Sequence, residues 1–121
     1  MKPVMFAALR RGLLMEELAR ASGGGDEAMR NEAFICGVFS LLDRMMKQPF
    51  AELLKAVPVP DSVRQVLVDG RGPYQPLLEV VRAVENESLF DVRDSAERLL
   101  LGVGEINRAV LRALAQAVQI Q

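Results

Sequence analysis

Few side chains in this sequence have types and spacings that could support catalysis. There is one cysteine, Cys36, and no histidine, so the residues that most often activate a nucleophile or bind zinc are scarce. Asp91 and Asp94 are the closest approach to a carboxylate pair for magnesium, but two acids one turn apart are typical of a solvated helix surface. We therefore expect no catalytic residue, no cofactor and no metal site in this chain, and predict that it is not an enzyme.

Cys36 and Ser40 have nucleophilic side chains but no base to activate them. Cys36 stands in an apolar stretch, where burial raises the pKa of a thiol instead of lowering it. Ser40 has Asp43 nearly one turn on, and no base accompanies the two. Both Cys36 and Ser40 are interpreted as inert core residues.

Four charged residues are candidates for an interaction or a structural role: Arg11, Glu16, Asp43 and Arg71. Arg11 and Glu16 are five residues apart, about 140° around a helix, so a buried Arg11 needs a partner from another element. We hypothesise that Asp43 is that partner. Arg71 stands between two glycines, where it could meet a carboxylate or phosphate of a partner, although an ordinary turn explains the pattern better.

The spacing of apolar residues places these side chains on helices. Between residues 33 and 47 apolar side chains cover most of a helical circumference, which is typical of a buried helix. Gly37 costs that helix about 1 kcal/mol relative to Ala, which suggests that a neighbouring backbone passes close. No strand alternation is evident. The sequence predicts an all-α fold, a compact bundle of about six to seven helices around this central helix.

The flanking segments also follow helical patterns. The first helix is predicted from about residue 3 to about residue 21, ended by Ser22 and three glycines, with Asp26 capping the next helix. Ser88 is predicted to cap a later helix. In the last helix the apolar residues that repeat every four positions are Ile106, Val110, Leu114 and Val118. Residues 1–121 are expected to form a single domain.

Composition excludes several classes of partner. The 121 residues are 50% hydrophobic with a net charge of -1, which argues against binding to nucleic acid or to an anionic membrane. No stretch reaches the roughly 18 apolar residues of a membrane span, so we expect no membrane insertion. A single cysteine cannot form an internal disulfide, and a cytoplasmic location is therefore expected.

Several motifs resemble the second half of HDOD signalling domains, the type that follows EAL cyclic-di-GMP phosphodiesterase-like domains. In that family an Arg-Ala…Glu-x-Leu-Ala helix precedes a Phe-x-x-Gly-x-x-Ser-Leu-Leu-Asp helix. The corresponding segments here are residues 11–19 and 32–43, and the resemblance continues through 49–54, 57–60 and 72–78. Gly12 stands where the family prefers Ala.

The resemblance implies a non-catalytic bacterial signalling module that contacts a protein partner, such as an EAL-type domain. The alternative is a degenerate HD-type phosphohydrolase or phosphodiesterase fragment, whose catalytic residues, if any, lie outside this chain. The N-terminal half of the family domain does not precede these motifs, so the chain is expected to be a fragment or a shortened protein. The surface that faced that half would stay apolar. We therefore predict a homodimer through this face, with the first and second helices contributing.

Overall fold

The computed structural model describes residues 3–22 and 26–120, and every regular element within these ranges is helical. Eight α-helices follow one another, and a π-helical turn, η1, continues the fifth. Their bounds are α1 (Pro3–Ala21), α2 (Glu27–Phe39), α3 (Leu42–Met46), α4 (Phe50–Ala56), α5 (Asp61–Arg64), η1 (Gln65–Asp69), α6 (Gln75–Glu85), α7 (Leu89–Arg98) and α8 (Val103–Ile120). The predicted all-α fold is confirmed.

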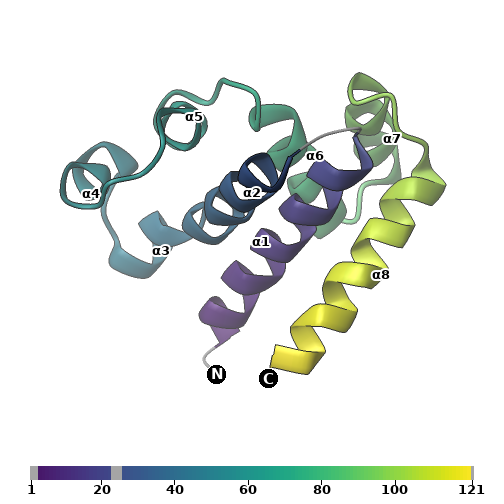
Figure 1. Cartoon of the computed structure of the whole chain (residues 1–121), viewed down its shortest axis with the longest axis horizontal. Helices are drawn as coiled ribbons and strands as arrows, with labels where there is room; N and C mark the ends of the chain where they lie inside the picture. Colours follow the sequence, from purple (N-terminus) through teal and green to yellow (C-terminus); the bar gives the residue numbers. More distant parts are fainter. Residues whose placement is uncertain (1–2, 23–25, 121) are drawn as a thin grey trace.

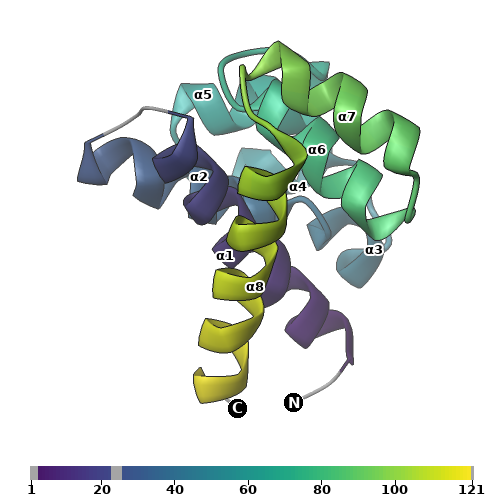
Figure 2. The same cartoon turned by 90° about the vertical axis from the view of Figure 1, so that its right-hand side faces the viewer.

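Helix α1 lies at the centre of the bundle. It packs against α2, α8 and α6, and Figure 1 shows it between α2 and α8. Helix α8 runs antiparallel to α1, so the two ends of the chain lie at the same end of the molecule (Figures 1 and 2). The short helices α3 and α4 lie at the opposite side of the bundle from α7 (Figure 1).

Burial explains the central place of α1. Between residues 11 and 19 every residue of this helix except Glu16 is buried, including Met15 and Leu18, which are 0% exposed. Helix α6 supplies the facing apolar surface. Its buried residues are Leu77, Leu78, Val80, Val81 and Ala83. A helix buried on nearly all sides needs neighbours all round, which is the arrangement that α2, α6 and α8 provide.

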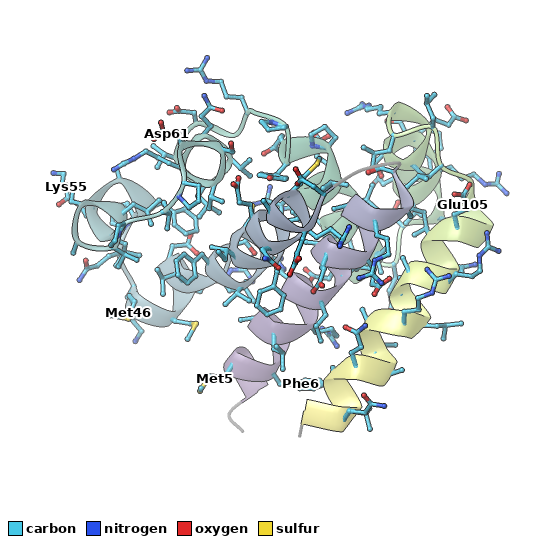
Figure 3. The ribbon with its side chains drawn as sticks, in the orientation of Figure 1. Met5, Phe6, Met46, Lys55, Asp61 and Glu105 are labelled. Carbon is cyan, nitrogen blue, oxygen red and sulfur yellow. The ribbon has the colours of Figure 1, made fainter. Side chains whose placement is uncertain are left out.

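The apolar stretch at residues 33–47 differs from the predicted single central helix. It is divided into α2, which ends at Phe39, and the five-residue α3, in which no residue is buried. Ser40 follows α2, where its hydroxyl donates to the Gly37 carbonyl (2.6 Å), and Leu41 leaves helical backbone geometry at ψ 3°. Met46 is 53% exposed and lies at the outer edge of the molecule (Figure 3).

The close backbone approach predicted at Gly37 is confirmed. A Cβ atom on Gly37 would lie 2.6 Å from the Arg11 carbonyl oxygen and 2.7 Å from Gly12 Cα. A Cβ on Gly12 would in turn lie 2.6 Å from Val38 Cγ2 and 3.0 Å from the Phe34 carbonyl oxygen. The backbones of α1 and α2 therefore touch at a pair of glycines, and Gly12 stands at a position with no room for a methyl group.

The buried face of helix α8 differs from the row of larger apolar residues that repeats every four positions in the sequence. Ile106 is buried as expected, but the rest of its buried row consists of alanines: Ala109, Ala113 and Ala117. Leu114 and Val118 are 38% and 67% exposed. Small side chains let the α8 backbone approach α1 closely, so the larger residues that repeat every four positions are left on the flank of the helix.

Local helix signals are reproduced at both predicted caps. Asp26 accepts a hydrogen bond from the Met29 amide (2.8 Å), and Ser88 accepts one from the Asp91 amide (3.3 Å). The break after η1 falls at Gly70, whose φ of 67° favours glycine. The glycines predicted to end the first helix, 23–25, lie outside the described residues. Within the described ranges, none of the helices has the length and apolar character to cross a bilayer.

Candidate functional site: a buried ion pair beside an apolar groove

Arg11 is the centre of a buried polar network that joins α1, α2 and α6. It lies on α1 and is only 5% exposed. Its Nε donates to Glu85 Oε2 (2.8 Å) and its Nη2 donates to Glu85 Oε1 (2.6 Å), a bidentate pair with the last residue of α6. Bidentate arginine–carboxylate geometry adds directional specificity to the charge attraction, so this pair fixes α1 relative to α6.

The third nitrogen of the guanidinium extends the network to α2. Arg11 Nη1 donates to Ser40 Oγ (2.9 Å), and Ser40 Oγ donates to the Gly37 carbonyl (2.6 Å). Ser40 was interpreted as an inert core residue, and its hydroxyl is in fact engaged on both sides in this chain of hydrogen bonds. The buried charge of Arg11 is thus compensated by a carboxylate from α6 and a hydroxyl at the end of α2, as a buried charge requires.

The prediction that Arg11 needs a partner from another element is confirmed, but Asp43 as that partner is wrong. Asp43 lies in α3 and its Oδ1 accepts a hydrogen bond from the Arg44 amide (2.8 Å). Because the stretch at 33–47 breaks after Phe39, Asp43 does not continue the α2 face that carries Gly37. Glu85, which comes 74 positions after Arg11, occupies the site instead.

The other two candidate residues are at the surface and do not join this network. The nearest oxygen of Glu16 lies 3.9 Å from Arg20 Nη2 on the next turn of α1. Arg71 has a side chain that is 75% exposed, and its Nε lies 3.8 Å from Asp69 Oδ2. The four candidates therefore do not form one site, and only Arg11 has a buried, fully bonded position.

Glu17 is a buried carboxylate that the sequence analysis missed. It is 1% exposed on α1, and its Oε1 accepts hydrogen bonds from Gln116 Nε2 of α8 (3.2 Å) and Arg20 Nη1 (3.4 Å). Its Oε2 lies 3.7 Å from Arg112 Nη1 and has no hydrogen-bond partner among the described residues. The sequence signal that could have identified Glu17 is the pair Arg112 and Gln116. These residues are four apart on the last helix, so both side chains can face the same acidic residue.

A groove opens beside the Arg11–Glu85 pair, between the first half of α1, the end of α6 and α8. Its volume is about 220 Å³. Its walls are largely apolar, and its lining residues are Arg10, Arg11, Leu14, Val84, Glu85, Glu87, Val110, Ala113 and Leu114. A second hollow, of about 260 Å³ and lined by residues of α7 and the start of α8, shares Val84, Glu87 and Val110 with it. The two hollows are neighbours along α8, and together they are called the groove along α8.

The candidate acids for a metal are engaged in local contacts. Asp94 Oδ2 accepts a hydrogen bond from Arg98 Nη2 (3.0 Å), and Asp91 stands in the first turn of α7, where its backbone amide donates to the cap Ser88. In the portion that the structure describes, no cluster of three or more His, Cys, Asp or Glu side chains is arranged to hold a metal ion. The groove between α6 and α7 that these acids line also contains Arg82 and Arg98.

Burial raises the pKa of two titratable side chains, Cys36 and Tyr74, in the core around α2. Burial raises the pKa of the Cys36 thiol from 9.0 to about 12, against a smaller opposing effect of the Arg82 charge. Tyr74 is 3% exposed, and burial together with its hydrogen bond to Glu32 Oε1 (3.1 Å) raises its pKa from 10.0 to about 12. The predicted rise in the thiol pKa is confirmed, so Cys36 stays protonated at neutral pH.

These shifts predict a loss of stability at alkaline pH. Between pH 9.0 and about 12 the unfolded chain loses the Cys36 proton before the folded chain does, so the free energy of unfolding falls as the pH rises. Tyr74 adds to the fall only above pH 10.0. Urea unfolding at intervals across this range should show a shallower fall between pH 9.0 and 10.0 for Cys36→Ala, and a shallower fall above pH 10.0 for Tyr74→Phe. Equal slopes for the wild type and both variants would contradict the assignment.

The fold and site define an all-α bundle with a structural ion pair beside a groove. Two known bacterial proteins are similar to the chain. The chain is 30% identical over 85 residues to the uncharacterised protein YuxH of Bacillus subtilis. It is 25% identical over 87 residues to the cyclic di-GMP phosphodiesterase CdgJ of Vibrio cholerae. These regions are 70% and 72% of this chain but about a fifth of each relative's length. No family model and no solved structure matches the chain.

Proposed function

We propose that this chain is a non-catalytic regulatory interaction module of bacterial cyclic-di-GMP signalling, of the HDOD type, that acts in the cytoplasm. Its weak similarity to CdgJ, which is named a cyclic di-GMP phosphodiesterase, supports a role connected with this signalling system. The motifs at residues 32–43 and 72–78 support the HDOD assignment. A single buried cysteine is compatible with the reducing cytoplasm.

The groove along α8 is the observation that carries the proposal. Its charged floor, the Arg11–Glu85 pair, is satisfied within the protein by two short hydrogen bonds, so neither group has a free position for acid–base chemistry. Besides that pair, the hollow of about 220 Å³ is lined by five apolar side chains from three helices and by the charged residues Arg10 and Glu87. Apolar grooves with few free polar groups suit the packing of a partner's side chains, which is what an interaction module requires.

The alternative is a degenerate HD-type phosphohydrolase or phosphodiesterase fragment, which would need carboxylates and a metal from this chain or from residues outside it. The activity for which CdgJ is named favours it. Turnover by the purified chain tests whether it carries catalytic residues of its own. Under the proposal, the purified chain with Mg²⁺ or Mn²⁺ hydrolyses neither cyclic di-GMP nor a generic phosphodiester above the rate of the buffer. Hydrolysis that rises in proportion to the protein concentration would support the alternative.

Titration into a purified EAL-type phosphodiesterase domain tests the interaction itself. The expected result is a saturable change in that domain's rate of cyclic di-GMP hydrolysis. Glu87 is exposed and lines both hollows of the groove. Glu87→Arg reverses the charge there, so it should weaken the apparent affinity for the EAL-type domain about tenfold. Glu97→Arg, an equal charge change at an exposed position of α7, is the control and should leave it unchanged. No effect of the wild-type chain on that domain would contradict the proposal.

A further inference from the structure

Helix α8 is attached to the bundle mainly through small side chains. It packs against α1 and to a smaller extent against α7, and Figures 1 and 2 show it at the edge of the molecule. Its buried residues are Ile106, Ala109, Ala113 and Ala117. A methyl group removes little apolar surface from water, so most of the buried row contributes little to the attachment of this 18-residue helix.

The surface of α1 under α8 contains a buried charge that is short of a hydrogen bond. Glu17 is 1% exposed, and two residues of α8 are directed to it. Gln116 Nε2 donates to Oε1 (3.2 Å), and Arg112 Nη1 lies 3.7 Å from Oε2, which has no hydrogen-bond partner among the described residues. A buried acceptor without a hydrogen bond destabilises the arrangement that buries it. Water reaches both oxygens once α8 moves away, so the burial of Glu17 favours opening.

The connection between α7 and α8 provides a point about which α8 can turn. Leu101 is 8% exposed and anchors the chain in the core, whereas the next residue, Gly102, is exposed. Apart from its neighbours in the chain, a Cβ atom on Gly102 would meet only Glu105 Oε1, at 4.0 Å. Glycine also has the widest choice of backbone conformations. Rotation at Gly102 therefore moves α8 and leaves Leu101 and α7 in place.

The contacts that hold the other helices together do not involve α8. Helix α1 meets α2 at the glycine pair Gly12 and Gly37, it is joined to α6 by the pair Arg11–Glu85, and α6 packs against α7. Proteins open locally in units whose loss leaves the remaining packing intact. We propose that α8 opens from α1 as one unit, by rotation at Gly102, while the other helices stay folded.

This opening is a conformational switch for the groove along α8. The residues of α8 that line the hollow of about 220 Å³ are Val110, Ala113 and Leu114. Those that line the second hollow are Val103, Ile106, Asn107 and Val110. The groove therefore exists only while α8 is closed, and a partner that fills it shifts the equilibrium towards the closed state. Only this effect of a partner rests on the proposed function, since the opening itself does not.

Labelling of thiols under native conditions tests the opening. Ala109→Cys and Ala117→Cys each place a thiol at a position of α8 that is 0% exposed, and Cys36, also 0% exposed, reports in the same molecule on the opening of α2. With an excess of an aromatic disulfide reagent, both thiols on α8 should react about ten times faster than Cys36, at rates that agree within about twofold. Rates equal to that of Cys36 would overturn the proposal. A fast thiol at 117 with a slow one at 109 would also overturn it, because that gradient indicates fraying from the end of the helix.

Hydrogen exchange of the wild-type chain gives a second readout without any substitution. Amides of residues 107–117 should share one protection factor, about tenfold or more below that of the α6 amides. Equal protection of α8 and α6 would overturn the proposal. An EAL-type domain at saturation should raise the protection of residues 107–117. Opening on which that domain has no effect would support the proposal and contradict the proposed function. Regulation of that domain by a chain whose α8 does not open would overturn the proposal and leave the proposed function standing.

Discussion

Gly37→Ala should lower the free energy of unfolding by about 3 kcal/mol, the upper part of the range for overpacked core substitutions. The added Cβ would lie 2.6 Å from the Arg11 carbonyl oxygen, 2.8 Å from Arg11 C and 2.7 Å from Gly12 Cα. All three atoms belong to the backbone of α1, so no side chain can rotate away to relieve the clash. The two helices must separate, and urea unfolding monitored by circular dichroism measures the cost.

Gly104→Ala is the matched control for this substitution. Gly104 also lies in a helix, α8, but a Cβ there would meet only Arg108 Nη1, at 3.6 Å. Alanine is preferred to glycine within a helix, so this variant should be more stable than the wild type by about 0.5–1 kcal/mol. If both alanines changed stability by similar amounts and in the same direction, the close contact of α1 and α2 would not be limiting.

Glu85→Gln should cost about 3 kcal/mol, because it keeps the side-chain volume but leaves the charge of Arg11 buried without a countercharge. Arg11 is 5% exposed, whereas the Glu85 side chain is 25% exposed, so we take the lower end of the range for breaking a buried pair. The surface pair Lys55–Glu52 is the control, with side chains 68% and 59% exposed. Glu52→Gln should change stability by less than about 0.5 kcal/mol.

Double-mutant cycles distinguish the observed partner of Arg11 from the one hypothesised from the sequence. Arg11→Ala and Glu85→Ala should be strongly non-additive, since each removes the same bidentate contact. Arg11→Ala and Asp43→Ala should add within about 0.5 kcal/mol, because Asp43 bonds to the Arg44 amide instead. A larger coupling with Asp43 than with Glu85 would refute the network described here.

The features that the sequence predicted correctly depend on short-range physics. Asp26 and Ser88 cap helices through bonds to amides three residues on, so the pattern that reveals them lies within one turn. Gly37 was informative because a glycine inside a strongly apolar helix has a cost that packing must repay. The unusual pKa expected of Cys36 followed from its apolar neighbours alone.

The features that could not be predicted from the sequence depend on which distant helices pack against each other in the folded chain. Nothing local connects Arg11 with Glu85, because five helical elements, α2–α5 and η1, separate α1 from α6, whereas Asp43 lies on the nearest helix pattern. The role of Glu17 is set by α8 in the same way. In α8 itself, the four-residue repeat identified the larger side chains, whereas the close approach to α1 selected the alanines for burial.

The glycine contact between α1 and α2 restricts how the bundle can move. Packed helices ordinarily slide past one another by small rotamer adjustments of the side chains between them. At Gly12 and Gly37 the two backbones are in direct contact, with no side chains between them that could adjust. Sliding there would bring main-chain atoms into steric clash. Helices α1 and α2 should therefore move together as one rigid unit. A rearrangement that displaces α2 also displaces α1, and so changes the packing of α1 against α8.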